Sequence, residues 1–382
     1  MQIALVAGEA SGDLLAAHLI KSIKTHVPDA RFVGIGGPRM QAEGFEAWWP
    51  QEKLAVRGYI EVLRHYREIV GIRRKLARRL LDDPPSVFIG VDAPDFNLCL
   101  ERKLRSGGIT SIHYVSPSIW AWRAGRLKNI AVSVSHMLCL FPFEPALYRD
   151  AGLPATFVGH PLADVIPIES RKETVREKLD IASGAQVVAL LPGSRQSELQ
   201  FMAECFLRAA LLIHARNPKV LFLVPLATKE TRALFDTMRW KMNAQELPMR
   251  LMFGHAQDAL SAADCALIAS GTATLEAALC KTPHVIAYKM SHWSWQIMRR
   301  MRLQPWVGLP NVLAGEFLVP ELLQDEATPE KLADAVLALL TDKPRRQHMI
   351  ERFAAIHEQL RQGASERAAE AILPYLKPVV KA

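Results

Sequence analysis

A turn built from small residues at positions 269–274 is the clearest candidate for chemistry in this sequence. It reads Ala-Ser-Gly-Thr-Ala-Thr, follows the apolar run 265–268 and leads into the helical run 277–280. This order predicts a strand, a tight turn and a helix, where backbone N–H groups can approach a ligand and the helix end adds about half a positive charge. Glu276 stands where a carboxylate can accept hydrogen bonds from ribose hydroxyls. The nucleotide-binding candidates are therefore Ser270, Gly271, Thr272, Ala273 and Glu276.

A second turn of the same kind lies at 192–198, between the apolar run 187–191 and the helical run 199–215. It contains Gly193, Ser194 and Arg195. A guanidinium can hold two phosphate oxygens at once and can offset the charge on a departing diphosphate. One glycine-containing turn by itself often does no more than join a strand to a helix. Two such turns in one half of the chain, one with an arginine, favour a nucleoside diphosphate as the ligand.

Asp92 is the candidate general base. It follows the apolar run 87–91 directly, so we expect its carboxylate at the carboxyl edge of a sheet, and the segment continues as Ala-Pro-Asp-Phe-Asn. A glycosyl transfer that inverts the anomeric centre needs one base near the attacking hydroxyl, and no second carboxylate when the leaving group is a nucleoside diphosphate. The alternative is that Asp92 caps the following segment, a role that suits Asp95 better.

The first turn of the chain, residues 8–13, could face an acceptor sugar. It reads Gly-Glu-Ala-Ser-Gly-Asp, which lacks the G-x-G-x-x-G spacing and places two acids where a dinucleotide pyrophosphate would lie. An NAD site is therefore not expected here. Ser11, Gly12 and Asp13 are candidates for contact with the hydroxyls or the phosphate of an acceptor, and Glu9 is a second candidate for the base. The alternative is a plain strand-to-helix turn with Asp13 near a cap.

The elements that must position these residues form two α/β domains. Short apolar runs alternate with helical stretches throughout the chain, which predicts doubly wound parallel sheets. We expect an N-terminal Rossmann-like domain at 1–166 and a C-terminal one at 167–345, facing each other across a cleft that holds the active site. The expected strands are at 3–7, 31–35, 87–91, 111–115, 136–140, 187–191, 220–225, 265–268 and 284–288.

Composition limits the function classes. Half of the 382 residues are hydrophobic, yet no run of about 18 apolar residues occurs, and the N-terminus has no basic leader, so we expect a cytoplasmic protein without a membrane-spanning helix. The five cysteines show no close pairing, which favours reduced thiols and argues against zinc. The net charge of +8 would allow nucleic-acid binding, but no motif for it is present, and no nucleic-acid partner is expected.

Two segments suggest contact with a membrane surface. Residues 56–81 carry eight Lys/Arg and two acids, and residues 289–306 combine three tryptophans with arginines. Basic residues beside an apolar face suit a helix lying among anionic headgroups, and aromatic residues favour the water–lipid boundary. The alternative is an ordinary amphipathic helix packed on the core. The expected membrane contacts are Ile60, Val62, Leu63, Tyr66, Ile69 and Val70.

Several long motifs give the chain a resemblance to a known family. It resembles the lipid-A-disaccharide synthases, bacterial glycosyltransferases with the two-domain fold called GT-B. The resemblance runs essentially from end to end. The motifs that carry it are residues 7–13, 36–40, 92–97, 114–123, 191–195, 270–276 and 309–311.

The resemblance implies a reaction and a set of roles. UDP-2,3-diacylglucosamine would donate its sugar to the 6-hydroxyl of 2,3-diacylglucosamine 1-phosphate (lipid X), giving a β-1,6 disaccharide and UDP, with no metal required. It implies Asp92 as base and Asn97 as a substrate contact. It also implies a site at the cytoplasmic face of the inner membrane, because both substrates carry acyl chains. The UDP side would consist of Gly193, Ser194, Arg195, Ser270 to Ala273, Glu276 and Asn311. The C-terminal helices, about 346–382, would return to the N-terminal domain, and two chains could exchange them in a homodimer.

Two alternatives remain at this point. One is another enzyme of the same fold, such as a UDP-sugar 2-epimerase, which would act on a soluble UDP-sugar without an acylated acceptor. The other is a basic membrane-surface protein with no enzymatic activity, which would release no UDP from any donor.

Overall fold

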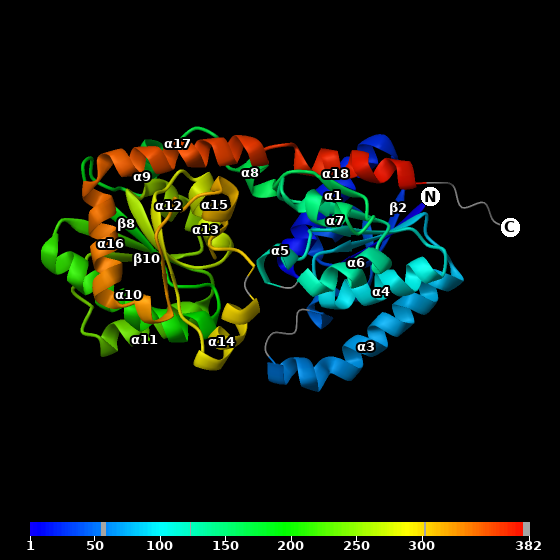
Figure 1. The fold of residues 1–382 in the computed structure, drawn as a ribbon, viewed down its shortest axis with the longest axis horizontal. Coiled ribbons are helices and arrows are strands. Elements are labelled where there is room, and N and C mark those ends of the chain that lie inside the picture. The colour runs from blue at the N-terminus through cyan, green and yellow to red at the C-terminus, as the bar shows by residue number, and fades with distance from the viewer. Residues whose placement is uncertain (55–58, 123, 302, 377–382) are drawn as a thin grey trace. The chain divides into compact units, whose positions relative to one another are not determined.

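The computed structural model describes residues 1–54, 59–122, 124–301 and 303–376. The side chains of residues 59–66, 122, 124, 293 and 297 lie outside this description. The chain divides into two compact units, each with its own parallel sheet (Figure 1). Unit 1 comprises Met1–Asp164 together with the C-terminal segment from Leu360, and unit 2 comprises Val165–Gln359.

Unit 1 is built on a seven-stranded parallel sheet in the order β3-β2-β1-β4-β5-β6-β7. The central strands are apolar along their whole length because helices cover both faces of the sheet. Its strands are β1 Gln2–Ala7, β2 Arg31–Gly36, β3 Phe45–Pro50, β4 Val87–Val91, β5 Ser111–Tyr114, β6 His136–Cys139 and β7 Ala155–Phe157.

Two apolar layers enclose this sheet. One face packs on α1 and α18, and the other packs on α3 and α4, whose buried residues include Leu76 and Leu100. Helix α18 lies beside α1 (Figure 1). Its residues Ala368, Ala369 and Ile372 are fully buried in the core that α1 helps to form. The helices of unit 1 are α1 Ala10–His26, α2 Pro38–Ala42, α3 Tyr59–Asp82, α4 Pro94–Ser106, α5 Ile119–Trp122, α6 Leu127–Ser133, α7 Glu144–Arg149, α8 Pro161–Val165 and α18 Ala364–Ile372, with short 3-10 turns at Gln51–Lys53, Ala124–Arg126 and Leu373–Tyr375.

Unit 2 repeats the architecture with six parallel strands in the order β10-β9-β8-β11-β12-β13. The strands are β8 Gln186–Leu191, β9 Val220–Leu226, β10 Met249–Phe253, β11 Cys265–Ala269, β12 His284–Tyr288 and β13 Glu321–Leu323. The helices are α9 Lys172–Lys178, α10 Gln196–Arg216, α11 Lys229–Lys241, α12 Ala256–Ala262, α13 Thr272–Leu279, α14 His292–Met301, α15 Leu309–Ala314, α16 Pro329–Thr341 and α17 Lys343–Leu360, with a 3-10 turn at Gln324–Glu326.

The C-terminal stretch that we expected to return to the first domain is divided between the units. Helix α17 is grouped with unit 2 as far as Gln359, where Lys281 Nζ lies 2.6 Å from His357 Nδ1. Helix α18 belongs to unit 1, where the Asp164 carboxylate accepts the N–H groups of Gly363 and Ala364 at 2.9 and 2.7 Å. The chain therefore passes between the units twice, after Asp164 and after Gln359.

No helix in the described part of the chain is both long and apolar enough to span a bilayer.

Candidate functional site

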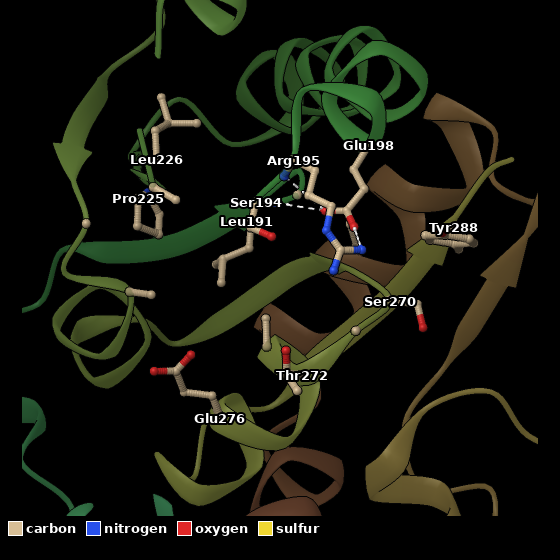
Figure 2. Close-up of a pocket in the computed structure, with 17 residues that line it drawn as sticks. Leu191, Ser194, Arg195, Glu198, Pro225, Leu226, Ser270, Thr272, Glu276 and Tyr288 are labelled. Carbon is tan, nitrogen blue, oxygen red and sulfur yellow. Dashed lines mark hydrogen bonds and ion pairs between the residues drawn. The ribbon is translucent and has the colours of Figure 1, made fainter. Parts of the chain in front are cut away.

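A cavity of about 450 Å³ opens at the carboxyl ends of the strands of unit 2 (Figure 2). Its walls come from the ends of β8, β9, β11 and β12 and from the loop after β10. The side chain of Arg195 reaches it from the N-cap of α10, and that of Glu276 reaches it from α13. The two turns selected from the sequence thus meet at one site, because the carboxyl ends of parallel strands share one edge of a sheet.

The N-terminus of α13 is open at this cavity. Gly271 is the N-cap residue and provides no side chain to close the helix end. Within the described residues, no acceptor is recorded for the N–H groups of Gly271, Thr272 and Ala273. These donors and the positive end of the helix dipole make a favourable position for a phosphate.

The turn after β8 differs from our expectation. The Glu198 carboxylate turns back and accepts the N–H groups of Ser194 and Arg195, at 2.9 and 3.3 Å. It also lies 3.5 Å from the Arg195 guanidinium, which remains 66 % exposed. The amides of Ser194 and Arg195 are therefore occupied by the chain itself, and the exposed guanidinium can reach a phosphate. Gly193 has a φ of +129°, and a Cβ there would lie 2.6 Å from Glu198 Cβ, so the turn requires glycine.

Two further side chains shape the cavity. Glu276 is half-buried, and burial raises the pKa of its carboxyl, while a hydrogen bond with Gln257 acts in the opposite direction. Tyr288, at the end of β12, lines the same cavity, and burial raises the pKa of its phenol. Sequence reasoning missed Tyr288 and Glu198, although the position of Tyr288 at the end of an expected strand was a usable signal.

Asn311 is placed differently from the role that the resemblance implied. It is fully buried and does not line the cavity. Its Nδ2 donates to Val319 O and Glu321 Oε1, both at 2.8 Å, and its Oδ1 accepts the N–H groups of Leu318 and Val319. Since all four hydrogen-bonding positions of the amide are used within the protein, Asn311 holds the loop after α15 and has no free group for UDP.

In unit 1, Asp92 lies at the carboxyl end of β4 in a strained turn. Asp92 and Ala93 have φ values of +52° and +43°, a left-handed conformation that non-glycine residues rarely adopt. The Asp92 N–H donates to Tyr114 O at 2.8 Å. The half-buried carboxylate has no recorded partner among the described residues. A half-buried, unpaired carboxylate on a strained turn suits a general base.

Asn97 supports this turn from the protein interior and is not placed to contact a substrate. Its side chain is fully buried, and its Nδ2 donates to Asp92 O at 2.8 Å. We therefore correct its expected role from substrate contact to support of the Asp92 turn.

The first turn of the chain lies against the Asp92 turn, since a Cβ on Gly8 would be 3.3 Å from Ala93 Cβ. Glu9 and Ser11 are exposed, and no acceptor is recorded among the described residues for the N–H groups of Ala10, Ser11 and Gly12. The N-terminus of α1 is thus open in the same way as that of α13.

Asp13 has a structural role in place of the expected substrate contact. It is 2 % exposed, and its carboxylate accepts the N–H groups of Gly37, Arg39 and Met40 at 2.9 to 3.1 Å. Asp13 therefore caps α2 rather than facing an acceptor. The partners of this carboxylate lie 24 to 27 residues away in the sequence, so its position in the chain gave no signal of them.

The expected membrane contacts are placed only in part. The side chains of Ile60, Val62, Leu63 and Tyr66 lie outside the described residues. Ile69 is partly buried against the core of unit 1, and Val70 is half-buried.

Comparison with known proteins decides between the readings that the sequence left open. The family model described as lipid-A-disaccharide synthetase matches residues 3–373. The chain belongs to the lipid-A-disaccharide synthase family. A relative of that name from Azoarcus is 59 % identical over 98 % of this chain and 96 % of its own length, and one from Dechloromonas aromatica is 59 % identical over 98 % and 99 %. The chain is thus a glycosyltransferase of lipid A biosynthesis, and neither alternative is favoured.

Solved structures confirm the GT-B fold. A UDP-GlcNAc 2-epimerase from Neisseria meningitidis matches with a TM-score of 0.67 over 98 % of this chain and all of its own, at 14 % identity. The glycosyltransferase of kitacinnamycin matches with a TM-score of 0.62 at 18 % identity over 98 % of this chain and 99 % of its own. At such identities the likeness shows the fold alone. The match to an epimerase therefore does not indicate that this chain is an epimerase.

Proposed function

We propose that this chain transfers 2,3-diacylglucosamine from UDP-2,3-diacylglucosamine to the 6-hydroxyl of 2,3-diacylglucosamine 1-phosphate, giving the β-1,6 lipid A disaccharide 1-phosphate and UDP. The observation that carries the proposal is the cavity of unit 2. It combines an open helix N-terminus, an exposed arginine and a half-buried glutamate. These are the groups that a diphosphate and a ribose need.

In the proposed donor complex, the diphosphate lies over the N–H groups of Gly271, Thr272 and Ala273, with Arg195 on its other side. Glu276 accepts hydrogen bonds from the ribose hydroxyls. The apolar wall at Pro225 and Leu226 is free to receive the uracil ring.

Asp92 is the proposed base. Its carboxylate takes the proton of the 6-hydroxyl as that oxygen attacks C1 of the donor sugar. The bond from C1 to the diphosphate oxygen breaks on the opposite face, UDP leaves with the bonding electrons, and the configuration inverts. The step requires the Asp92 turn of unit 1 to approach a donor held by unit 2. Glu9 is the second candidate for the proton because it is exposed and lies in the first turn of the chain, which packs against the Asp92 turn.

The acceptor phosphate is assigned to the open N-terminus of α1, through the N–H groups of Ala10, Ser11 and Gly12. No metal is invoked, since the guanidinium of Arg195 and the end of α13 supply the positive field that a divalent cation supplies in other transferases. We expect turnover to persist in excess EDTA, and loss of turnover that Mg²⁺ restores would contradict this part of the proposal.

Contact with the cytoplasmic face of the inner membrane is proposed through the first half of α3. The support is the apolar residues in this half of the sequence, the five basic residues in the second half of the helix, and the acyl chains of the proposed substrates. An exchange of C-terminal segments between two chains stays a prediction. The hydrogen bonds that α18 makes with unit 1 would be the same in either arrangement.

The test is a UDP-release assay with the acylated donor, with and without the acylated acceptor. Asp92→Asn keeps the size of the side chain and removes its basicity, so kcat should fall by about 100-fold or more, while UDP affinity measured by calorimetry stays near that of the wild type. Asp95→Asn, three residues on and 83 % exposed, is the matched control and should retain turnover. Turnover by Asp92→Asn at the wild-type rate would remove Asp92 as the base.

A further inference from the structure

The segment after β5 is a long motif that the proposed function leaves without a role. It joins β5 to α5, and Val115 within it has a φ of +85°, which a β-branched residue adopts only under strain. The residue before it, Tyr114, accepts the N–H of Asp92 at 2.8 Å. The residue that precedes the strained segment is therefore hydrogen-bonded to the turn that carries the proposed base.

A chain of buried polar groups lies behind this segment. Ser116 Oγ and Tyr148 OH are 2.7 Å apart, and Tyr148, on α7, is fully buried. Glu144, the first residue of α7, is 1 % exposed and accepts the N–H of Phe141 at 2.9 Å. Ser116 also lies close enough to the Glu144 carboxyl to lower its pKa. The hydrogen bond with Tyr148 of α7 thus fixes the segment immediately after the strained residue.

Aromatic packing holds the other end of the segment. Trp120 is 8 % exposed, and its ring meets that of Phe143 edge-on, with 5.3 Å between the ring centroids. Phe143 directly precedes Glu144 in the chain. Both ends of the segment are therefore held by the same short stretch around the start of α7.

We propose that Glu144, Tyr148 and Ser116 form a buried brace that holds the Asp92 turn in its reactive orientation, and that Glu144 and Tyr148 are positioning residues for the transfer. This inference rests on the proposed role of Asp92. In the brace, the Tyr148 hydroxyl donates to Ser116 Oγ, and the Ser116 hydroxyl donates to the Glu144 carboxylate. A buried hydrogen-bonded network of this kind is rigid, and it can hold a strained backbone that would otherwise relax.

The charge of Glu144 provides a readout that a purely structural role would not move. Burial raises the pKa of Glu144 to about 7, and the hydrogen bonds from Phe141 and Ser116 act in the opposite direction. The ionised carboxylate accepts from both donors, so the brace is complete above this pH and weaker below it. Cys139 and Tyr148 are the ionisable groups that face Glu144, and burial raises the pKa of both, so neither titrates near neutrality.

The experiment measures kcat across the pKa of about 7 for the wild type, Glu144→Gln and Tyr148→Phe. We expect the wild-type kcat to rise with pH through this value. Glu144→Gln should lose that rise, and kcat of both variants at high pH should fall between about 10-fold and 100-fold, the cost of misplacing a reacting group. UDP affinity should be unchanged, because the proposed UDP site belongs to unit 2.

Tyr375→Phe is the matched control. It removes a hydroxyl of the same unit that lies 3.0 Å from His136 Nδ1, at the opposite end of β6, and its kcat should stay within about twofold of the wild type. A wild-type profile that is flat through this pH, or a Glu144→Gln profile that keeps the rise, would overturn the brace. Should Glu144→Gln fail to fold, Tyr148→Phe decides alone, and an unchanged kcat rejects the proposal. If Asp92→Asn is inactive while both variants match the wild type, the brace alone fails; if Asp92→Asn is active, the proposed base fails.

Discussion

Polar residues beside turns differ in whether their side chains line the cavity or are already hydrogen-bonded within the protein. Arg195 and Glu276 line the cavity and were identified from turns in the sequence, because a ligand site at the edge of a parallel sheet leaves a local signal. Asp13, Asn97 and Asn311 are also polar residues beside turns, yet their side chains are buried and hydrogen-bonded to the protein itself. The sequence cannot separate the two cases, since the partners of the buried groups are set by tertiary contacts.

Arg195 gives the sharpest prediction at this scale. Arg195→Ala removes a charge-assisted contact with the diphosphate, worth roughly 1.5–3 kcal/mol, so the Kd for UDP should rise by about 10-fold to 100-fold and kcat should fall. Calorimetry and the UDP-release assay measure the two effects. Arg208→Ala is the matched control, because Arg208 lies on α10, the helix that follows Arg195, in an exposed ion pair with Glu204. Equal UDP affinity in both variants would contradict the phosphate role of Arg195.

Among the elements, interior strands were predictable and edge strands were not. Every interior strand of both sheets was expected from an apolar run, whereas the four edge strands β3, β7, β10 and β13 were all missed. Interior strands of a parallel sheet are buried on both faces and read as continuous apolar runs. The edge strands are only partly buried, as in β10. They therefore contain polar residues, which interrupt the apolar run by which a strand is recognised in the sequence.

The same scale yields a prediction for α3, whose two ends should respond differently to polar substitution. Changing Ile60, Val62 and Leu63 to Ser should release the protein from anionic vesicles, because the first half of the helix is the proposed membrane contact. Ile69→Ser should instead lower the melting temperature, since Ile69 packs against the core. Vesicle sedimentation and thermal unfolding separate the two effects.

Val132→Ser, on α6 of the same unit and 52 % exposed, is the control for α3 and should change neither property. Undiminished vesicle binding by the triple variant would assign those three residues to the protein interior.

At the scale of the whole molecule, each unit contains a buried neutral histidine, and acid should destabilise both. Burial lowers the pKa of His160 in unit 1 and of His284 in unit 2 to about 4, from the ordinary 6.5. Because the unfolded chain binds the proton more tightly, this contribution is complete above pH 6.5 and is lost as the pH falls toward 4. It amounts to at most about 3 kcal/mol for each histidine.

Denaturant unfolding at about pH 7 and about pH 5 tests this prediction. The wild type should lose more stability between the two conditions than His160→Gln or His284→Gln. A histidine variant that loses as much as the wild type would show that the buried ring does not control the acid response.

The whole fold also explains why the reaction could not be read from architecture. A UDP-GlcNAc 2-epimerase and a glycosyltransferase share this fold with the chain at 14 % and 18 % identity. Function resides in the residues at the carboxyl ends of the strands rather than in the sheets themselves. The long motifs at residues 92–97, 191–195 and 270–276 were therefore more informative than the predicted domains.

The double passage of the chain between its units has a consequence for biosynthesis. Ala368, Ala369 and Ile372 complete the core of unit 1, but they follow all of unit 2 in the sequence. During translation, all of unit 2 therefore emerges from the ribosome while unit 1 still exposes the apolar side of α1. During this interval the nascent enzyme exposes an apolar surface that chaperones can bind. A premature stop codon just after α17 would leave that surface permanently exposed.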